Sequence, residues 1–141
     1  MAKLAQNGML LTKGITLTCF ISAQQLRTMQ GFCKGEEKQF FIDKLNELHT
    51  LINNMPATGK TDGQGGNAIC QLRYFHNSGA VWYITERDTS VIQHQAFGWA
   101  QMFPGCGELG YISIEEIIQH GAQLDLHFTP IPVKDIPEKN E

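Results

Sequence analysis

The chain has 141 residues, of which 42% are hydrophobic and 18% are charged, and its formal net charge is −3. This length fits one domain, and this composition is typical of a folded globular protein rather than a disordered chain. No apolar run approaches the roughly 20 residues of a membrane helix, and the N-terminus lacks a secretory-signal pattern, so we expect a cytoplasmic protein without a membrane segment. Four widely spaced cysteines, Cys19, Cys33, Cys70 and Cys106, favour reduced thiols over a disulfide framework or zinc site.

The charge is unevenly distributed along the chain. Residues 1–87 carry nine basic and six acidic side chains, whereas residues 88–133 carry five acidic side chains and no Lys or Arg. Binding to a phosphate backbone requires clustered basic residues. We therefore do not expect the protein to bind nucleic acid directly.

Two helices are predicted before residue 56. Ser22 followed by Gln25 has the pattern of a capping box, which predicts a short helix from residue 23 to about residue 30, ended by Gly31. A second helix is predicted from residue 36 to residue 54, because apolar residues recur there at four- and three-residue spacing. These residues are Phe41, Leu45, Leu48, Ile52 and Met55. The stripe favours a helix that packs on a sheet, with a coiled coil formed with a partner as the alternative.

The glycine-rich segment over residues 56–66 contains the triplet Gly59-Lys60-Thr61, which also occurs at the end of phosphate-binding loops. Such a loop needs a glycine five positions before Gly59 and lies between a strand and a helix. This chain has Asn54 at that position, and a predicted helix precedes the segment. The segment is therefore interpreted as a flexible connector.

Five segments after the connector have the composition or alternation of β-strands. They are residues 67–75, 80–86, 96–102, 108–113 and 123–128. The turn at residues 76–79 predicts a hairpin, and Gly98 indicates a bulge or a close backbone approach. In the first of these strands one face is predicted to consist of Ala68, Cys70, Leu72 and Tyr74.

A second capping box, formed by Ser113 and Glu116, predicts a short helix that ends at Gly121. Residues 129–141 are rich in proline and charge and are predicted to trail from the fold. Together the elements predict a single α+β domain over residues 1–141, in which an antiparallel sheet of four or five strands carries N-terminal helices on one face. Its parts are a helical part (22–55), a connector (56–66), a strand-rich module (67–128) and a tail (129–141).

Several short blocks in the strand-rich module carry a resemblance to a known family. They read WYITERD from Trp82, AFGWA from Ala96, GELGYISIEEI from Gly107 and LDLHFTP from Leu124. In this order they resemble domain-of-unknown-function family 2958, a small bacterial family of conjugative plasmids and integrated mobile elements, over roughly residues 71–130. The resemblance implies a cytoplasmic protein of a mobile element and brings no catalytic residues with it. The chain departs from the family pattern at Arg87 and by an insertion of Phe103-Pro104.

Acidic residues near predicted strand ends form one candidate site. If the strand ends converge, carboxylates and an imidazole could bind a divalent cation that activates water for hydrolysis. The residues concerned are Glu86, Asp88, Glu108, Asp125 and His127. The alternatives are that these acids are solvated side chains at strand ends or that they contact a partner.

Aromatic residues on neighbouring strands form the second candidate site. Trp82, Trp99 and Tyr111, together with Glu108, are predicted to form a surface that binds a protein partner. The favoured function is a non-enzymatic accessory or binding protein of a plasmid or mobile element that needs no cofactor, with a host or defence system as the candidate target. A small divalent-metal-dependent hydrolase is the alternative. The sequence predicts no oligomeric state.

Overall fold

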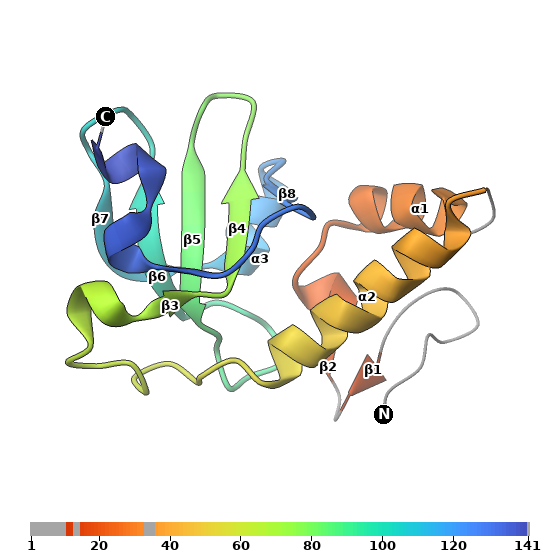
Figure 1. Cartoon of the computed structure of the whole chain (residues 1–141), viewed down its shortest axis with the longest axis horizontal. Helices are drawn as coiled ribbons and strands as arrows, with labels where there is room; N and C mark the ends of the chain where they lie inside the picture. The colour runs from red at the N-terminus through yellow and green to blue at the C-terminus, as the bar shows by residue number, and fades with distance from the viewer. Residues whose placement is uncertain (1–10, 13–14, 33–35, 141) are drawn as a thin grey trace.

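The computed structural model describes residues 11–12, 15–32 and 36–140 of the chain (Figure 1). At its centre is a five-stranded antiparallel sheet in the order β7-β6-β5-β4-β8. Its strands are β4 (Leu72–Phe75), β5 (Val81–Glu86), β6 (Ala96–Gln101), β7 (Glu108–Ile112) and β8 (Gln123–Leu124). The predicted α+β class is confirmed, and β4 and β5 form the predicted hairpin. Cys33 lies outside the described residues.

Two short strand pairs accompany the main sheet. β1 (Leu11–Thr12) pairs with β2 (Ile15–Thr16), and β3 (Ile69–Cys70) pairs with β9 (Ile131–Pro132). The strand predicted over residues 67–75 is therefore divided, because β3 leaves the main sheet while β4 stays in it. Four short 3-10 helices complete the secondary structure of the described residues: η1 (Leu17–Cys19), η2 (Gly65–Asn67), η3 (Val133–Asp135) and η4 (Pro137–Asn140).

The described residues form three α-helices close to the predicted positions, but the prediction that Gly31 ends the first helix is wrong, because that helix continues through Gly31 to Phe32. The three helices are α1 (Ala23–Phe32), α2 (Lys38–Asn53) and α3 (Ile114–Gln119). The Ser22 hydroxyl accepts a hydrogen bond from the Gln25 amide at 3.1 Å, and Ser113 does the same for Glu116 at 3.2 Å. Gly121, at φ 98°, ends the turn after α3. In the described part of the chain, none of the helices combines the length and hydropathy that crossing a bilayer requires.

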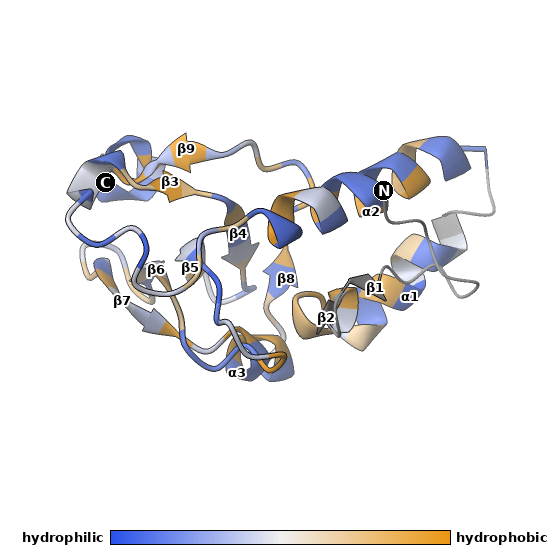
Figure 2. Cartoon of the chain, turned by 90° about the horizontal axis from the view of Figure 1, so that it is seen from below, coloured by the Kyte–Doolittle hydropathy of each residue, from blue (hydrophilic) through white to orange (hydrophobic). Residues whose placement is uncertain are grey.

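The larger hydrophobic core joins α1 and α2 to one face of the sheet. From the helices it takes Leu26, Met29, Leu45, Leu48 and Ile52, and from the sheet Leu72, Tyr74, Trp82, Ile84 and Leu124. Tyr74 is fully buried, and its hydroxyl donates a hydrogen bond to the Phe20 carbonyl at 2.5 Å. Both long helices lie toward the β8 side of the sheet in two perpendicular views (Figures 1 and 2). The apolar stripe of α2 is thus used to bury the first face of the sheet, as a helix packed on a sheet requires.

A second, smaller core covers the opposite face of the sheet, and the C-terminal segment builds it. Val133 and Ile136 are buried there against Tyr83 and Trp99, together with Ala68, Cys70 and Val81. The orange strands β3 and β9 lie side by side over this face in Figure 2. The prediction that residues 129–141 trail from the fold is therefore wrong. The predicted common face of Ala68, Cys70, Leu72 and Tyr74 is also wrong, since the first two belong to this second core.

Ile136→Val tests whether the C-terminal segment stabilises the fold. Ile136 is fully buried, so loss of one methylene should lower the free energy of unfolding by about 1 kcal/mol. The matched control is Ile69→Val, because Ile69 is 39% exposed and should change stability by less than about 0.5 kcal/mol. Urea unfolding measures both, and equal effects of the two variants would mean that the segment is not held in this core.

Candidate functional site

A β-bulge at the end of β5 decides where Glu86 points. Ile84 lies opposite Gly98, but Glu86 lies opposite Phe97, so one extra residue, Thr85, is inserted in β5. Without the bulge, Glu86 would continue the Trp82 and Ile84 face and enter the apolar core. The bulge turns its carboxylate to the other face of the sheet. Glu86 is nevertheless only 1% exposed, so the expectation of a solvated strand end is corrected at this residue.

The glycine-rich segment supplies the partners of the Glu86 carboxylate. The amide of Gly59 donates to Oε1 and the amide of Thr61 to Oε2, both at 2.7 Å, and the Thr61 hydroxyl also donates to Oε2. The triplet that resembles the end of a phosphate loop thus surrounds an anion that belongs to the protein itself. The Glu86 carboxylate already takes the hydrogen-bond donors of Gly59 and Thr61, which leaves no space there for a nucleotide phosphate.

Further contacts fix the same segment to Arg87, the residue that directly follows β5. The Arg87 amide donates to the Pro56 carbonyl at 3.0 Å, and the Thr58 amide donates to the Arg87 carbonyl at 2.9 Å. The Arg87 side chain donates to the carbonyl of Ile52, in the last turn of α2, at 3.0 Å, where a cation suits the helix dipole. The prediction of a flexible connector is therefore wrong, because residues 57–61 are bonded to the end of β5.

The other acidic residues do not join Glu86. Both oxygens of Asp88 accept amides of its own loop, from Ser90 and Gln95 at 3.0 Å each. Asp125 follows β8 and Glu108 begins β7, so they lie at opposite edges of the sheet, roughly 19 Å apart across four strand spacings. No group of three or more possible metal ligands forms among the described residues. The condition for the alternative cation site is therefore not met, because Glu86, Asp88, Glu108, Asp125 and His127 do not converge.

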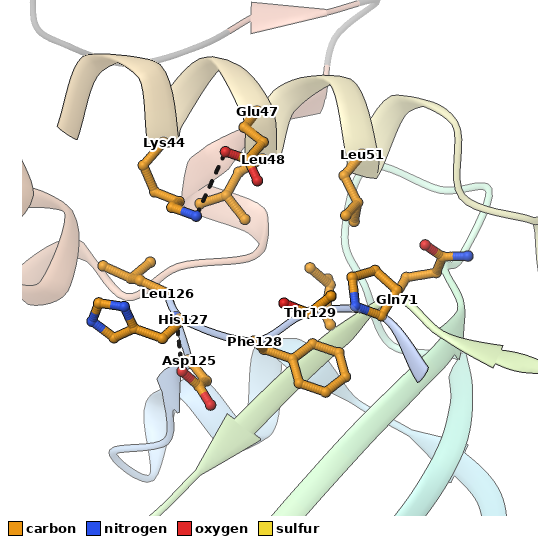
Figure 3. A pocket seen from close by; sticks show the side chains of 12 residues that line it. Lys44, Glu47, Leu48, Leu51, Gln71, Asp125, Leu126, His127, Phe128 and Thr129 are labelled. Carbon is orange, nitrogen blue, oxygen red and sulfur yellow. Dashed lines mark hydrogen bonds and ion pairs between the residues drawn. The ribbon is translucent and has the colours of Figure 1, made fainter. Parts of the chain in front are cut away.

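Asp125 and His127 instead border a cleft between α2 and residues 125–130 (Figure 3). Its volume is about 130 Å³, and α2 contributes Lys44, Glu47, Leu48 and Leu51. Lys44 turns toward Glu47, with 3.6 Å between Nζ and Oε2, while Asp125 points away from it. Besides apolar side chains, the cleft holds the His127 imidazole and the Thr129 hydroxyl, for which no mutual hydrogen bond is formed, and two carboxylates, Glu47 and Asp125, that are already ion-paired with Lys44 and Arg73. This set provides neither a nucleophile with its base nor a metal site.

Asp125 belongs to an ionic network that ties the second face together. Arg73 pairs with Asp125 at 3.2 Å and with Glu138 at 3.4 Å, and its Nε donates to the Tyr83 hydroxyl at 3.1 Å. Tyr83 in turn donates to Glu138 at 2.6 Å. Burial and the bond to Glu138 raise the pKa of Tyr83 to about 12, although Arg73 opposes this change. The network fixes the C-terminal segment to β4 and β5.

Tyr83→Phe tests this network through its alkaline stability. The pKa of Tyr83 is raised above the ordinary value near 10, so ionisation favours the unfolded chain as pH rises from about 10 to about 12. Tyr83→Phe should cost about 1 kcal/mol at pH 7 and should lose less stability over that alkaline range than wild type. Tyr111→Phe is the control, because the Tyr111 side chain is 71% exposed. Identical pH profiles for wild type and Tyr83→Phe would contradict the network.

The predicted partner surface is only partly exposed. Trp82 is 7% exposed in the first core and Trp99 is 4% exposed in the second, so neither can contact a partner in this fold, and the prediction is corrected at both. Tyr111 is 71% exposed, and Leu109 on the same strand is 45% exposed. Phe97 packs edge to face against Tyr111, with 5.6 Å between ring centroids. We call Phe97, Leu109 and Tyr111 the β7 patch.

A hollow of about 310 Å³ adjoins the β7 patch on the second face. Phe97 and Leu109 line it from the sheet, and Asp62 lines it from the glycine-rich segment. In the described part of the chain, the carboxylates of Asp62 and Glu108 have no hydrogen-bond or ion-pair partner, in contrast to those of Glu86, Asp88 and Asp125. The edge beside β7 therefore combines exposed apolar side chains with two free acids.

Sequence reasoning missed Leu109 and Asp62 as members of this surface. Leu109 and Tyr111 alternate with Glu108 and Gly110, which is the pattern of a strand with one apolar face. That pattern is equally consistent with a buried face. The strand order, which places β7 at the edge, distinguishes the two cases.

Comparisons with known proteins add no relative: no protein-family model matches the chain, and no curated protein or solved structure matches it significantly.

Proposed function

We infer that this is a non-enzymatic accessory protein of a plasmid or mobile element that acts by binding another protein through the edge of its sheet at β7. The observation that carries this proposal is the β7 patch, where an apolar surface remains exposed at an edge strand that pairs with β6 on one side and with no described strand on the other. Contiguous exposed apolar surface beside polar groups is typical of protein interaction sites. Tyr111, a large aromatic residue, is of the type that dominates such interfaces.

The alternative of a metal-dependent hydrolase lacks support from the geometry. The acids it requires lie apart, and three of them already serve as acceptors for the protein's own amides and guanidinium groups. Glu86 holds the glycine-rich segment, Asp88 holds the loop after β5, and Asp125 belongs to the ionic network around Arg73.

The setting of the proposal is the bacterial cytoplasm. The resemblance of residues 71–130 to a mobile-element family supports this setting, with a host or defence system as the candidate target. The Cys70 thiol is consistent with it, because burial raises its pKa to about 12 and keeps it protonated and unreactive.

Photo-crosslinking from position 111 tests the proposed surface. A benzoyl-phenylalanine placed at Tyr111 in bacterial host cells should form a covalent adduct with the partner, whereas the same group at Phe40 should not. Phe40 is the matched control, since it is an exposed aromatic at 48% on α2, away from β7. Adducts of equal yield at both positions would contradict a surface at β7.

Tyr111→Lys should weaken binding of the partner identified in this way by about tenfold or more. The substitution removes a large apolar contact and places a charge on the strand edge, which opposes strand pairing. Isothermal titration with the purified partner measures the loss, and Phe40→Lys serves as the control. An unchanged affinity of Tyr111→Lys would exclude the β7 patch as the binding surface.

A further inference from the structure

The two edges of the main sheet differ in how their backbone groups are bonded. At β8 the Asp125 amide bonds inward to the Arg73 carbonyl at 2.8 Å, so the N–H and C=O of the preceding Leu124 point outward. The Gln25 side chain satisfies both: its Nε2 donates to the Leu124 carbonyl at 2.8 Å, and its Oε1 accepts from the Leu124 amide at 3.0 Å. An amide side chain from α1 therefore occupies the place of a further strand at this edge.

The edge at β7 has no such cover. It is five residues long and contains neither lysine nor proline, the residues that usually protect an edge strand. No described strand or side chain bonds to its outward backbone groups. A Cβ added at Gly110, in the middle of the strand, would meet nothing within 4 Å. Figure 1 places β7 at the end of the sheet opposite the long helices.

The side chains around β7 indicate what kind of segment fits beside it. A strand added to an edge places alternate side chains on each face of the sheet, so every second residue would lie along Leu109 and Tyr111. The hollow next to Leu109 can accept an apolar or long side chain, and Asp62 in its wall can pair with a cation. Glu108 offers a second free carboxylate at the start of the strand.

We propose that β7 binds an extended segment of a partner protein as a sixth strand of the sheet, and that this segment alternates apolar residues with at least one lysine or arginine. The proposal rests on the proposed function and specifies its partner. Main-chain hydrogen bonds supply the affinity, whereas the β7 patch and the two acids select the side chains.

A second copy of this chain fits the same edge less well. Pairing of β7 with itself would bring Asp62 and Glu108 of both copies to one interface. Residues 88–133 contain no Lys or Arg to compensate for them. Like charges placed across an interface disfavour association.

Selection from a phage-displayed library of random octapeptides on the intact protein tests the proposal. Phage that also bind the Tyr111→Lys variant are removed by counter-selection. The affinity of the remaining binders for the wild type is then compared with their affinity for the Phe40→Lys variant. The enriched peptides should alternate apolar residues with Lys or Arg, and should bind Tyr111→Lys about tenfold or more weakly than wild type. Synthetic peptides are then N-methylated at odd or at even positions. Since only alternate residues donate to the neighbouring strand, one set should lose binding and the other should keep it.

Three results would overturn the proposal: no enrichment over Tyr111→Lys, enrichment of acidic or non-alternating peptides, or equal binding of both N-methylated sets. A dimer of the protein alone in sedimentation, dissociated by Tyr111→Lys, would instead make a second copy the occupant. If a partner crosslinks at position 111 but the selected peptides do not compete with it, strand addition is wrong and the proposed function stands. If nothing crosslinks at position 111, the proposed function fails as well.

Discussion

Replacement of Gly98 by alanine should lower the free energy of unfolding by about 3 kcal/mol or more and lower the melting temperature by roughly 6–12 °C. An added Cβ would lie 1.8 Å from the Tyr83 carbonyl oxygen and 2.9 Å from its carbon. These are backbone atoms of β5, which cannot rotate away as a side chain can. Either β6 must separate from β5 or the bulge at Thr85 must rearrange, and both changes disrupt the centre of the sheet.

The register partner of Gly98 provides the matched control. Gly110 lies directly opposite it on β7, but a Cβ there would meet nothing within 4 Å. Gly110→Ala should therefore change the free energy of unfolding by less than about 0.5 kcal/mol. Urea unfolding of both variants measures the difference. If the two alanines had the same effect, the close approach of β5 and β6 at Gly98 would be wrong.

Gly98 illustrates what local sequence can predict. A glycine among aromatic and apolar residues of a strand indicates a bulge or a close backbone approach, and the structure shows both, with the bulge on the neighbouring strand. The caps at Ser22 and Ser113 were predictable for the same reason, since a helix start is decided by residues three positions apart. The second half of the first capping box is not formed, because Gln25 bonds to Leu124 instead.

The position of Glu86 was not predictable from alternation. One inserted residue reverses the face of every residue after it, and Thr85 is not marked as an insertion by its type. Alternation alone places Glu86 on the Trp82 face, whereas the bulge aims it at the glycine-rich segment. The candidate cation site failed for a related reason: the strand order that separates Glu108 from Asp125 is set by tertiary pairing.

The C-terminal segment was missed because its contribution to the core depends on few residues. Val133 and Ile136 are buried, but Pro132, Pro137 and neighbouring charges give the segment the composition of a tail. A 3-10 turn three residues long brings the two apolar side chains to the same side. They cover Tyr83 and Trp99, whereas Trp82 is buried in the first core, and of the aromatic residues proposed to contact a partner only Tyr111 therefore stays exposed.

Glu86→Gln should lower the free energy of unfolding by about 2–3 kcal/mol. The amide that replaces one carboxylate oxygen is a donor, and it would face a backbone or hydroxyl donor of Gly59 or Thr61. Hydrogen bonds to charged groups are the stronger ones in proteins, and a buried donor left without an acceptor carries its full desolvation cost. The site is almost fully buried, so water does not replace the lost acceptor.

Glu108→Gln is the matched control for this substitution. The same change occurs at a strand end, but Glu108 is exposed and has no partner among the described residues, so stability should change by less than about 0.5 kcal/mol. Amide hydrogen exchange adds a local readout, since Gly59 and Thr61 should lose protection in Glu86→Gln more than the amides of β5 do. Unchanged protection at both positions would show that the Glu86 carboxylate does not hold the glycine-rich segment.

Glu86→Gln should also weaken binding of a basic peptide at the edge beside β7, because Asp62 follows Thr61 directly and lines the hollow there. Glu86 thus links the stability of the glycine-rich segment to the shape of the proposed binding surface.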